Sequence, residues 1–252
     1  MTRNSDAAVS RRPPIELLNE ASLFLDFDGT LVDIAPRPDE VLVSLELRQL
    51  LEQLRERLDG RLILLTGRSA AEVEKLLHPL SLSIGGHHGA EMRDGGRSAP
   101  VERPGLLDEL AKELRRLEQD HPGVQVEEKP LGIALHYRQA PDAEEACRDA
   151  VERAAERSGL AVQPGKMVFE LKRSGVDKGT ALQALMMRPA FSGTTPVFLG
   201  DDLTDESALR AAQELGGSGI IVGDRTPTAA RYRLQSVADA LAWLSEACEA
   251  IR

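Results

Sequence analysis

The chain has 252 residues and a formal net charge of −10, and its 31 basic and 41 acidic side chains are interspersed along the sequence. Because no basic block stands out, we expect no nucleic-acid partner. No apolar run approaches the length that crosses a bilayer, so we expect no membrane partner. Cys147 and Cys248 are too far apart to suggest a disulfide framework, which favours a reducing compartment and a cytoplasmic protein.

The first part of the chain has the pattern of an α/β domain. Residues 1 to 12 are polar and lack the apolar stretch of a signal peptide, and we expect them to be a disordered tail. Apolar runs at Leu23 to Leu25 and Ile63 to Leu65 predict two strands, and leucines between residues 45 and 58 recur at helical spacing. Strand, helix, strand order is typical of a mostly parallel sheet covered by helices.

The middle of the chain follows another pattern, in which two helices are each followed by two strands. These elements are predicted at residues 106 to 119, 124 to 129, 133 to 138, 142 to 158, 160 to 163 and 167 to 172. Such a repeat indicates a small α+β domain inserted into the larger one. We predict the inserted domain at residues 98 to 172 and the larger domain at residues 13 to 97 and 173 to 252.

After the insertion the first pattern returns. Val197 to Leu199 predicts a strand, residues 205 to 215 a helix, and Gly219 to Val222 a further strand. An amphipathic helix is predicted at Val237 to Ala250. The larger domain is therefore expected to be built from both ends of the chain.

Two acids, Asp26 and Asp28, stand directly after the first predicted strand. Ligands of parallel sheets gather at the carboxyl ends of strands, so both acids lie where chemistry usually takes place. Two neighbouring carboxylates repel each other unless a cation intervenes, and the pair favours a hard divalent ion such as Mg²⁺. The structural alternative is an Asp-Gly turn that only ends the strand.

The strand at Val197 to Leu199 also ends in acids. Asp201 and Asp202 follow it after a glycine, and a metal-ligand role is favoured for Asp201 when it is considered together with Asp26. Asp205 begins the next helix. Its structural alternative is an acid in a first helical turn, where the helix dipole favours a negative charge.

Two further segments carry groups that can hold an anion. Thr66, Gly67 and Arg68 follow the second strand, where a hydroxyl and a backbone amide could donate to a phosphoryl oxygen, although a simple cap and turn would also fit. Lys178 opens a predicted helix. A lysine is unfavourable in a first helical turn, and a nearby anion would explain it.

In this order the chain resembles the haloacid dehalogenase superfamily of phosphotransferases in four segments, DFDGT at 26 to 30, TGR at 66 to 68, DKG at 177 to 179 and GDDLTDE at 200 to 206. It resembles the trehalose-6-phosphate phosphatase family in particular through GHHGAE at 86 to 91, Lys129, His136-Tyr137-Arg138, Gly165 and Glu170. The resemblance implies an α/β fold, with a Rossmannoid core, a mostly parallel sheet and an inserted α+β cap of the type called C2.

The resemblance also implies roles for individual residues. Asp26 would attack phosphorus and form an aspartyl-phosphate, Asp28 would transfer protons, and Thr66 and Lys178 would hold phosphoryl oxygens. The implied cofactor is Mg²⁺, with ligands or supporting groups from Asp26, Asp28, Asp201, Asp202 and Asp205. The implied substrate contacts are Gly67, Arg68, His88 and Glu91 from the core, and Lys129, Arg138 and Glu170 from the cap.

The substrate implied by the family is a small sugar phosphate, trehalose 6-phosphate, in trehalose biosynthesis, and we expect a monomer. One alternative is a phosphatase or mutase of another sugar phosphate, such as sucrose 6-phosphate, glucosylglycerol phosphate or mannosyl-phosphoglycerate. Another is a catalytically inactive sugar-phosphate sensor. For the cap residues the structural alternatives are packing of His136 and Tyr137, and an ion pair between Arg138 and Glu170.

Overall fold

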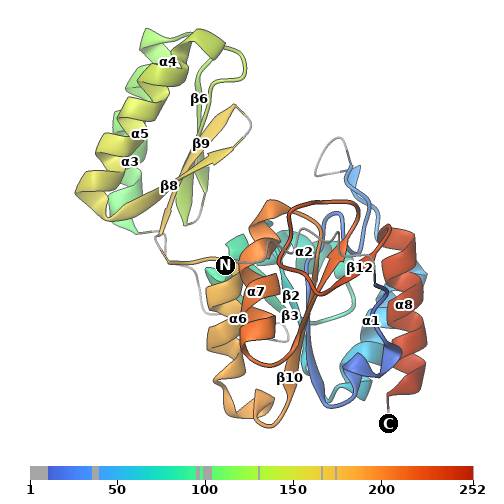
Figure 1. Cartoon of the computed structure of the whole chain (residues 1–252). Coiled ribbons are helices and arrows are strands. Elements are labelled where there is room, and N and C mark those ends of the chain that lie inside the picture. The colour runs from blue at the N-terminus through green and yellow to red at the C-terminus, as the bar shows by residue number, and fades with distance from the viewer. Residues whose placement is uncertain are drawn as a thin grey trace, which may run out of the picture. The chain divides into compact units, whose positions relative to one another are not determined.

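The computed structural model describes residues 11–35, 40–94, 97–98, 104–129, 131–165, 167–173 and 175–251. The chain divides into two compact units, Met1–Ala99 with Val176–Arg252, and Pro100–Gly175 (Figure 1). The second unit thus begins at residue 100 rather than the predicted 98 and ends at 175 rather than 172. In the described ranges no helix combines the length and the apolar character that crossing a membrane requires.

The first unit is built on an eight-stranded sheet in the order β12-β11-β10-β1-β2-β3-β4-β5. The pairs from β12 to β3 are parallel, whereas β4 and β5 join antiparallel at one edge. The strands are β1 Ala21–Leu25, β2 Leu62–Leu65, β3 Ser83–Gly86, β4 Glu91–Asp94, β5 Arg97–Ser98, β10 Thr195–Gly200, β11 Ser218–Val222 and β12 Tyr232–Leu234.

Helices cover both faces of this sheet, as Figure 1 shows for α6 and α7 on one side and α1 and α8 on the other. Alternation along β1 sends Leu23 and Leu25 into the core with α1, α2 and α8, and Phe24 into the core with α6 and α7. The strand is buried along its whole length, which explains its continuous apolar run. The helices are α1 Leu45–Arg57, α2 Ala70–Leu77, α6 Lys178–Met186, α7 Glu206–Glu214 and α8 Val237–Ala250.

Short 3₁₀ turns complete the first unit, at η1 Ile15–Leu18, η3 His87–Gly89, η5 Pro189–Phe191 and η6 Leu203–Asp205. The helix predicted from residue 205 therefore begins as the turn η6 and continues as α7. Two helices that open beside functional motifs are capped by side chains. Ser69 and Glu72 form a capping box at α2, and Asp177 caps α6.

The segment before η1 packs against the first unit. Arg12 forms an ion pair with Asp239, and the carbonyl of Arg11 accepts a hydrogen bond from the Arg233 amide. The Trp243 indole donates to the carbonyl of Pro13. The predicted disordered tail therefore does not extend to residues 11 and 12, because these contacts hold them to the core. Residues 1 to 10 lie outside the described residues.

The second unit is a four-stranded antiparallel sheet in the order β6-β7-β9-β8, with helices packed on it. Ile133, Leu135 and Leu171 meet the helices in a core that is separate from the cores of the first unit. The elements are α3 Gly105–Leu114, α4 Arg116–Asp120, β6 Gln125–Lys129, β7 Gly132–His136, η4 Pro141–Ala143, α5 Glu144–Ser158, β8 Leu160–Gly165 and β9 Val168–Arg173.

Candidate active site

Two central strands bring acids from distant parts of the sequence together. β1 and β10 are parallel neighbours with Leu25 opposite Leu199, so Asp26 and Asp201 leave the sheet at the same edge. The Asp26 amide donates to the carbonyl of Leu199 at 2.9 Å, which extends the pairing to the first acid. Carboxylate oxygens of Asp26, Asp201 and Asp205 all lie within 4.8 Å of one another. The sequence analysis grouped Asp26 with Asp201 only because each follows a strand, and the structure brings their side chains close together.

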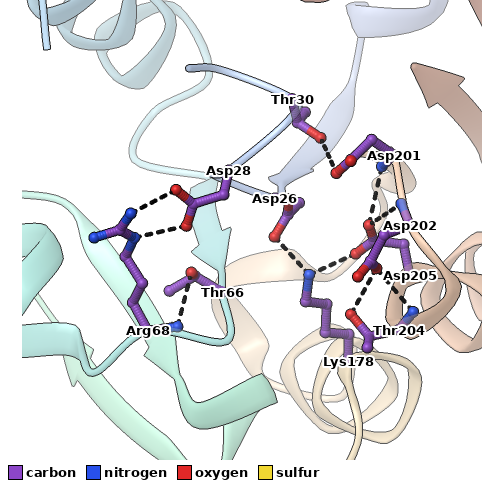
Figure 2. Close-up of polar contacts among 10 residues, drawn as sticks. All are labelled: Asp26, Asp28, Thr30, Thr66, Arg68, Lys178, Asp201, Asp202, Thr204 and Asp205. Carbon is purple, nitrogen blue, oxygen red and sulfur yellow. Dashed lines mark hydrogen bonds and ion pairs between the residues drawn. The ribbon is translucent and has the colours of Figure 1, made fainter. Parts of the chain in front are cut away.

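Lys178 lies in the middle of this cluster (Figure 2). Its Nζ is 2.5 Å from Asp26 Oδ1 and 2.5 Å from Asp205 Oδ1, and only 2% of the side chain is exposed. Lys178 is the first residue of α6, and it reaches the two carboxylates because α6 packs closely on α7. A Cβ on Gly179 would lie 2.5 Å from the backbone oxygen of Ser207. The unfavourable position of a lysine in the first helical turn is therefore offset by two carboxylates.

Asp205 organises the loop that carries Asp201. Its Oδ2 accepts hydrogen bonds from the amides of Asp201 at 2.9 Å and Asp202 at 3.1 Å, while Oδ1 contacts Lys178. Asp202 accepts through Oδ1 from both the amide and the hydroxyl of Thr204. These contacts favour a supporting role for Asp202 and Asp205, and leave Asp26 and Asp201 as the better placed metal ligands.

The charges of the cluster are not balanced by Lys178 alone. Burial raises the pKa of Asp26 to about 6, although Lys178 opposes the shift. Burial and the charges of Asp205 and Asp202 raise the pKa of Asp201 to about 6, and burial and Asp26 raise that of Asp205 to about 7. Burial disfavours a charged Lys178, yet Asp26 and Asp205 outweigh it and raise its pKa. Three close carboxylate oxygens with raised pKa values fit a hard divalent cation, which accepts oxygen ligands.

Asp28 lies apart from this cluster and faces Arg68 (Figure 2). Arg68 donates through Nε to Oδ2 at 2.6 Å and through Nη2 to Oδ1 at 2.7 Å, so the ion pair is bidentate. The amide of Arg68 donates to the hydroxyl of Thr66, which is 1% exposed. The site therefore presents two acid and base pairs side by side, Asp26 with Lys178 and Asp28 with Arg68.

The sequence model of the family described as trehalose-phosphatase matches residues 24–238. The chain belongs to the trehalose-phosphatase family. It is 40% identical over 232 residues to the trehalose-6-phosphate phosphatase of Escherichia coli (strain K12), which covers 91% of this chain and 87% of the relative. It is 38% identical to a probable trehalose-phosphate phosphatase of Sinorhizobium fredii (strain NBRC 101917 / NGR234), over 83% of this chain and 80% of the relative.

Solved structures confirm the fold of this trehalose-phosphatase family member. The crystal structure of a trehalose-6-phosphate phosphatase related protein has a TM-score of 0.73 and 29% identity, and covers 90% of this chain and 97% of that one. A haloacid dehalogenase-like hydrolase from B. subtilis has a TM-score of 0.59 at 18% identity, over 88% of this chain and 97% of that one. The predicted haloacid dehalogenase-like α/β fold with a mostly parallel sheet and an inserted cap is therefore confirmed.

The predicted substrate residues of the core take different positions around Thr66. The His88 ring lies against Gly67, where an added Cβ would be 3.0 Å from His88 Cε1, and the His88 amide donates to the carbonyl of Thr66. Glu91 is 6% exposed and accepts from the amide of Ala70 at 3.0 Å, at the start of α2. Arg93 donates to the same carboxylate. In this structure Glu91 supports the start of α2.

The predicted cap residues belong to the second unit. Lys129 Nζ is 3.0 Å from Glu170 Oε1. Glu170 therefore pairs with Lys129 and not with Arg138, the partner that the structural alternative predicted. Arg138 is exposed and follows the end of β7. His136 contacts Glu127 at 2.9 Å. Tyr137 is buried and stacks on Phe169 with ring centroids 5.2 Å apart, as the packing alternative proposed for it.

The sequence analysis missed three small residues that fit the acids together. The Thr30 hydroxyl lies 3.4 Å from Asp201 Oδ1. A Cβ on Gly29 would lie 2.2 Å from Asp201 Oδ2, and one on Gly200 would lie 2.3 Å from the Asp205 carboxyl carbon. All three stand in the motifs at 26 to 30 and 200 to 206. The sequence analysis considered Gly29 only as part of a turn and gave Thr30 and Gly200 no role, although a glycine beside acids at a strand end also signals close approach.

Proposed function

We propose that this member of the trehalose-phosphatase family is a Mg²⁺-dependent phosphatase that hydrolyses trehalose 6-phosphate to trehalose and phosphate in trehalose biosynthesis. The observation that carries the proposal is that Asp26 lies beside both Lys178 and Asp201 at the edge of the sheet. The identity of 40% with a relative named trehalose-6-phosphate phosphatase supports the substrate.

Asp26 is proposed as the nucleophile. One of its oxygens forms a bond to phosphorus while the bond from phosphorus to the sugar oxygen breaks, which leaves an aspartyl-phosphate. Asp28 donates a proton to the departing sugar oxygen. In the second step Asp28 takes a proton from water, whose oxygen attacks phosphorus and releases Asp26. Burial of Asp26, which is 5% exposed, limits bulk water around the reacting oxygen.

Charge on the transferring oxygens is offset by groups that the fold has already placed. Lys178 contributes a buried ammonium group directly beside Asp26. The hydroxyl of Thr66 accepts from the Arg68 amide and carries a proton of its own, which it donates to a phosphoryl oxygen. Carboxylate oxygens of Asp26 and Asp201 and the Asp28 carbonyl would hold Mg²⁺, which would supply positive charge to the same oxygens. Asp202 and Asp205 support these ligands through the loop they brace.

Recognition of the disaccharide is proposed for the cap residues Lys129, Arg138 and Glu170, together with His88, Gly67 and Glu91 from the core. Lys129 and Glu170 form a pair of opposite charge on one sheet, which suits several sugar hydroxyls at once. Cytoplasmic location and a monomeric state stay predictions of the sequence.

The test is inorganic phosphate release from trehalose 6-phosphate, sucrose 6-phosphate, glucosylglycerol phosphate and mannosyl-phosphoglycerate, with Mg²⁺ and with excess chelator. The proposal expects the highest kcat/KM with trehalose 6-phosphate and loss of turnover on chelation. A higher kcat/KM with another sugar phosphate would make that compound the substrate and leave the proposed phosphatase mechanism unchanged. No turnover of any of them would favour the catalytically inactive sensor.

A further inference from the structure

Arg68 contacts the proposed proton-transfer residue through both arms of its guanidinium group. The two distances to Asp28 are 2.6 and 2.7 Å, and they use both carboxylate oxygens. A short aspartate side chain can rotate about two bonds, and a fork of two parallel hydrogen bonds fixes both rotations. The hydrogen bond to Asp28 is also the largest cause that raises the pKa of Arg68, and the charge of Asp28 adds to it. The pair is therefore an orienting contact as well as an ion pair.

The guanidinium group is itself held in place. The Arg68 amide donates to Thr66 Oγ1 at 3.1 Å, and the Arg68 carbonyl accepts from the His87 amide at 2.9 Å. The guanidinium carbon of Arg68 lies over the buried ring of Phe27, 5.9 Å from the ring centroid. Only 13% of the Arg68 side chain is exposed. Arg68 thus projects from a fixed turn at the end of β2, beside the end of β1 that carries Asp28.

The arrangement separates two acids that lie two positions apart in the sequence. Figure 2 shows Asp26 turned toward Lys178 and Asp28 turned toward Arg68. A carboxylate at residue 28 that was not held in this way could rotate toward Lys178, whose Nζ is already shared by Asp26 and Asp205. It would then compete with the nucleophile for the same charge and leave the position from which a proton reaches the leaving group.

We propose that Arg68 is a positioning residue that holds the Asp28 carboxylate away from the Lys178 cluster and toward the leaving group, and that it acts on turnover through Asp28. This inference rests on the proposed function, in which Asp28 transfers protons. It differs from the role that the resemblance implies for Arg68, which is direct contact with the substrate. The two roles predict different kinetics.

The test is a double-mutant cycle in the full chain, with Arg68→Ala, Asp28→Asn and both together, on trehalose 6-phosphate. If Arg68 acts through Asp28, Arg68→Ala should lower kcat by about tenfold or more in the native chain. In the Asp28→Asn background the same substitution should lower kcat by less than about threefold. KM and the inhibition constant of inorganic phosphate should stay within about twofold, because the proposed role gives Arg68 no contact with either ligand. Arg68→Lys should restore part of kcat through one hydrogen bond.

Leaving-group dependence gives an independent readout. Phenyl phosphate and p-nitrophenyl phosphate lack a sugar, and phenolate is the more basic leaving group. Arg68→Ala should therefore lower kcat/KM, which covers the steps up to departure of the leaving group, by about tenfold with phenyl phosphate and by less than about threefold with p-nitrophenyl phosphate. Arg157→Ala is the matched control, since Arg157 also contacts both oxygens of one carboxylate, Glu113, at 2.8 Å but lies on α5. It should change neither rate.

Three results would overturn the inference. The first is that the losses in the double variant multiply, and the second is that kcat/KM falls equally on both aryl phosphates. The third is a rise in KM without a fall in kcat. Each would assign Arg68 to the substrate. An unfolded Arg68→Ala protein would leave Arg68→Lys for the same cycle. If trehalose 6-phosphate is not the substrate, the aryl phosphates still test Arg68, so the two failures are distinguishable.

Discussion

At the residue scale, Lys178 and its two carboxylates form a buried ionic triad. Removing one partner of a buried ion pair usually costs about 3 to 5 kcal/mol, because a charge is left uncompensated. Here Lys178 keeps Asp205 when Asp26 is altered, and Asp205 is itself completely buried. The chemistry at Asp26 can therefore be removed at a smaller cost in stability than a single buried pair would allow.

Replacement of the nucleophile should separate turnover from folding. Asp26→Asn should abolish phosphate release, because an amide cannot form the aspartyl-phosphate, while the midpoint of thermal unfolding should shift by no more than about 4 °C. Asp205→Asn is the contrasting variant. It places an amide among Lys178 and two backbone donors and should cost about 2 to 4 kcal/mol of unfolding free energy. Near-normal turnover by Asp26→Asn would refute the covalent mechanism.

The raised pKa values predict how Mg²⁺ affinity depends on pH. Asp26 and Asp201 have pKa values of about 6 in the metal-free protein and Asp205 one of about 7, so protons occupy these groups as the pH falls below 7. The ion binds the deprotonated carboxylates and must displace those protons. The dissociation constant should therefore rise, which means weaker binding, by roughly tenfold or more between pH 7.5 and pH 5.5.

Isothermal titration with MgCl₂ at the two pH values measures this change. Repeating the titration in buffers of different ionisation enthalpy counts the protons released. Asp201→Asn should bind more weakly and show a flatter pH dependence, because one competing proton site is gone. The same affinity at both pH values would show that these acids do not hold the ion.

At the element scale, the sequence predicted the strands that carry the chemistry better than the strands at the sheet edges. β1, β2 and β10 have continuous apolar runs because helices cover both faces of the sheet. Three strands were not predicted. β3 contains two glycines, β4 contains three charged residues, and β12 is only three residues long, so none of them has an apolar run or an alternating pattern long enough to predict a strand. The helix predicted at residues 106 to 119 is interrupted at Arg115, where α3 ends and α4 begins.

The sequence did not predict which cation pairs with which acid at the strand ends. The motifs placed Asp26, Asp28, Arg68 and Lys178 at one edge of a parallel sheet, but either cation could face either acid. The partner is fixed by side-chain rotation and by the close packing of α6 on α7, and neither follows from spacing. For the same reason the contact of Gly29 with Asp201 appears only in three dimensions.

Gly29 offers a test of that contact with a matched control. Its φ is +82°, and an alanine Cβ would lie 2.2 Å from Asp201 Oδ2, whereas Gly216 has φ +83° with nothing within 4 Å. Alanine at either position should cost about 1 kcal/mol of unfolding free energy for the left-handed backbone. Asp201 can rotate away from the new methyl group, so Gly29→Ala should not be much less stable than Gly216→Ala.

The two variants should differ in function. Gly29→Ala moves a proposed ligand and should weaken Mg²⁺ binding and lower kcat by about tenfold or more, while Gly216→Ala should keep both. Chemical denaturation gives the free energies, and titration with Mg²⁺ gives the affinities. Equal activity of the two variants would mean that the position of Asp201 is not critical for the ion.

At the scale of the whole molecule, two units with separate cores divide the proposed work. The switch from strand-helix alternation to helix-strand-strand order predicted this division, because it reflects two kinds of sheet. The pairing of side chains on the face of the second sheet could not be predicted from the sequence. Lys129 and Glu170 meet across β7, where Gly132 and Ala134 are their strand neighbours and leave room for the contact.

The position of this pair predicts a selective effect on the sugar substrate. Lys129→Ala or Glu170→Ala should lower kcat/KM for trehalose 6-phosphate by about tenfold or more, since a group built to hydrogen-bond sugar hydroxyls is lost. The same variants should change kcat/KM for p-nitrophenyl phosphate by less than about threefold, because Asp26, Lys178 and Asp201 all belong to the first unit.

Glu113→Ala provides the control for loss of a cap ion pair as such. Glu113 pairs with Arg157 at 2.8 Å between exposed side chains of α3 and α5, so its loss should leave both substrates unaffected. Equal falls on both substrates in Lys129→Ala and Glu170→Ala would assign the pair to stability or to the core chemistry. A fall on trehalose 6-phosphate alone, with an unchanged unfolding midpoint, would place substrate selection in the second unit, because the phosphoryl chemistry would then have continued without it.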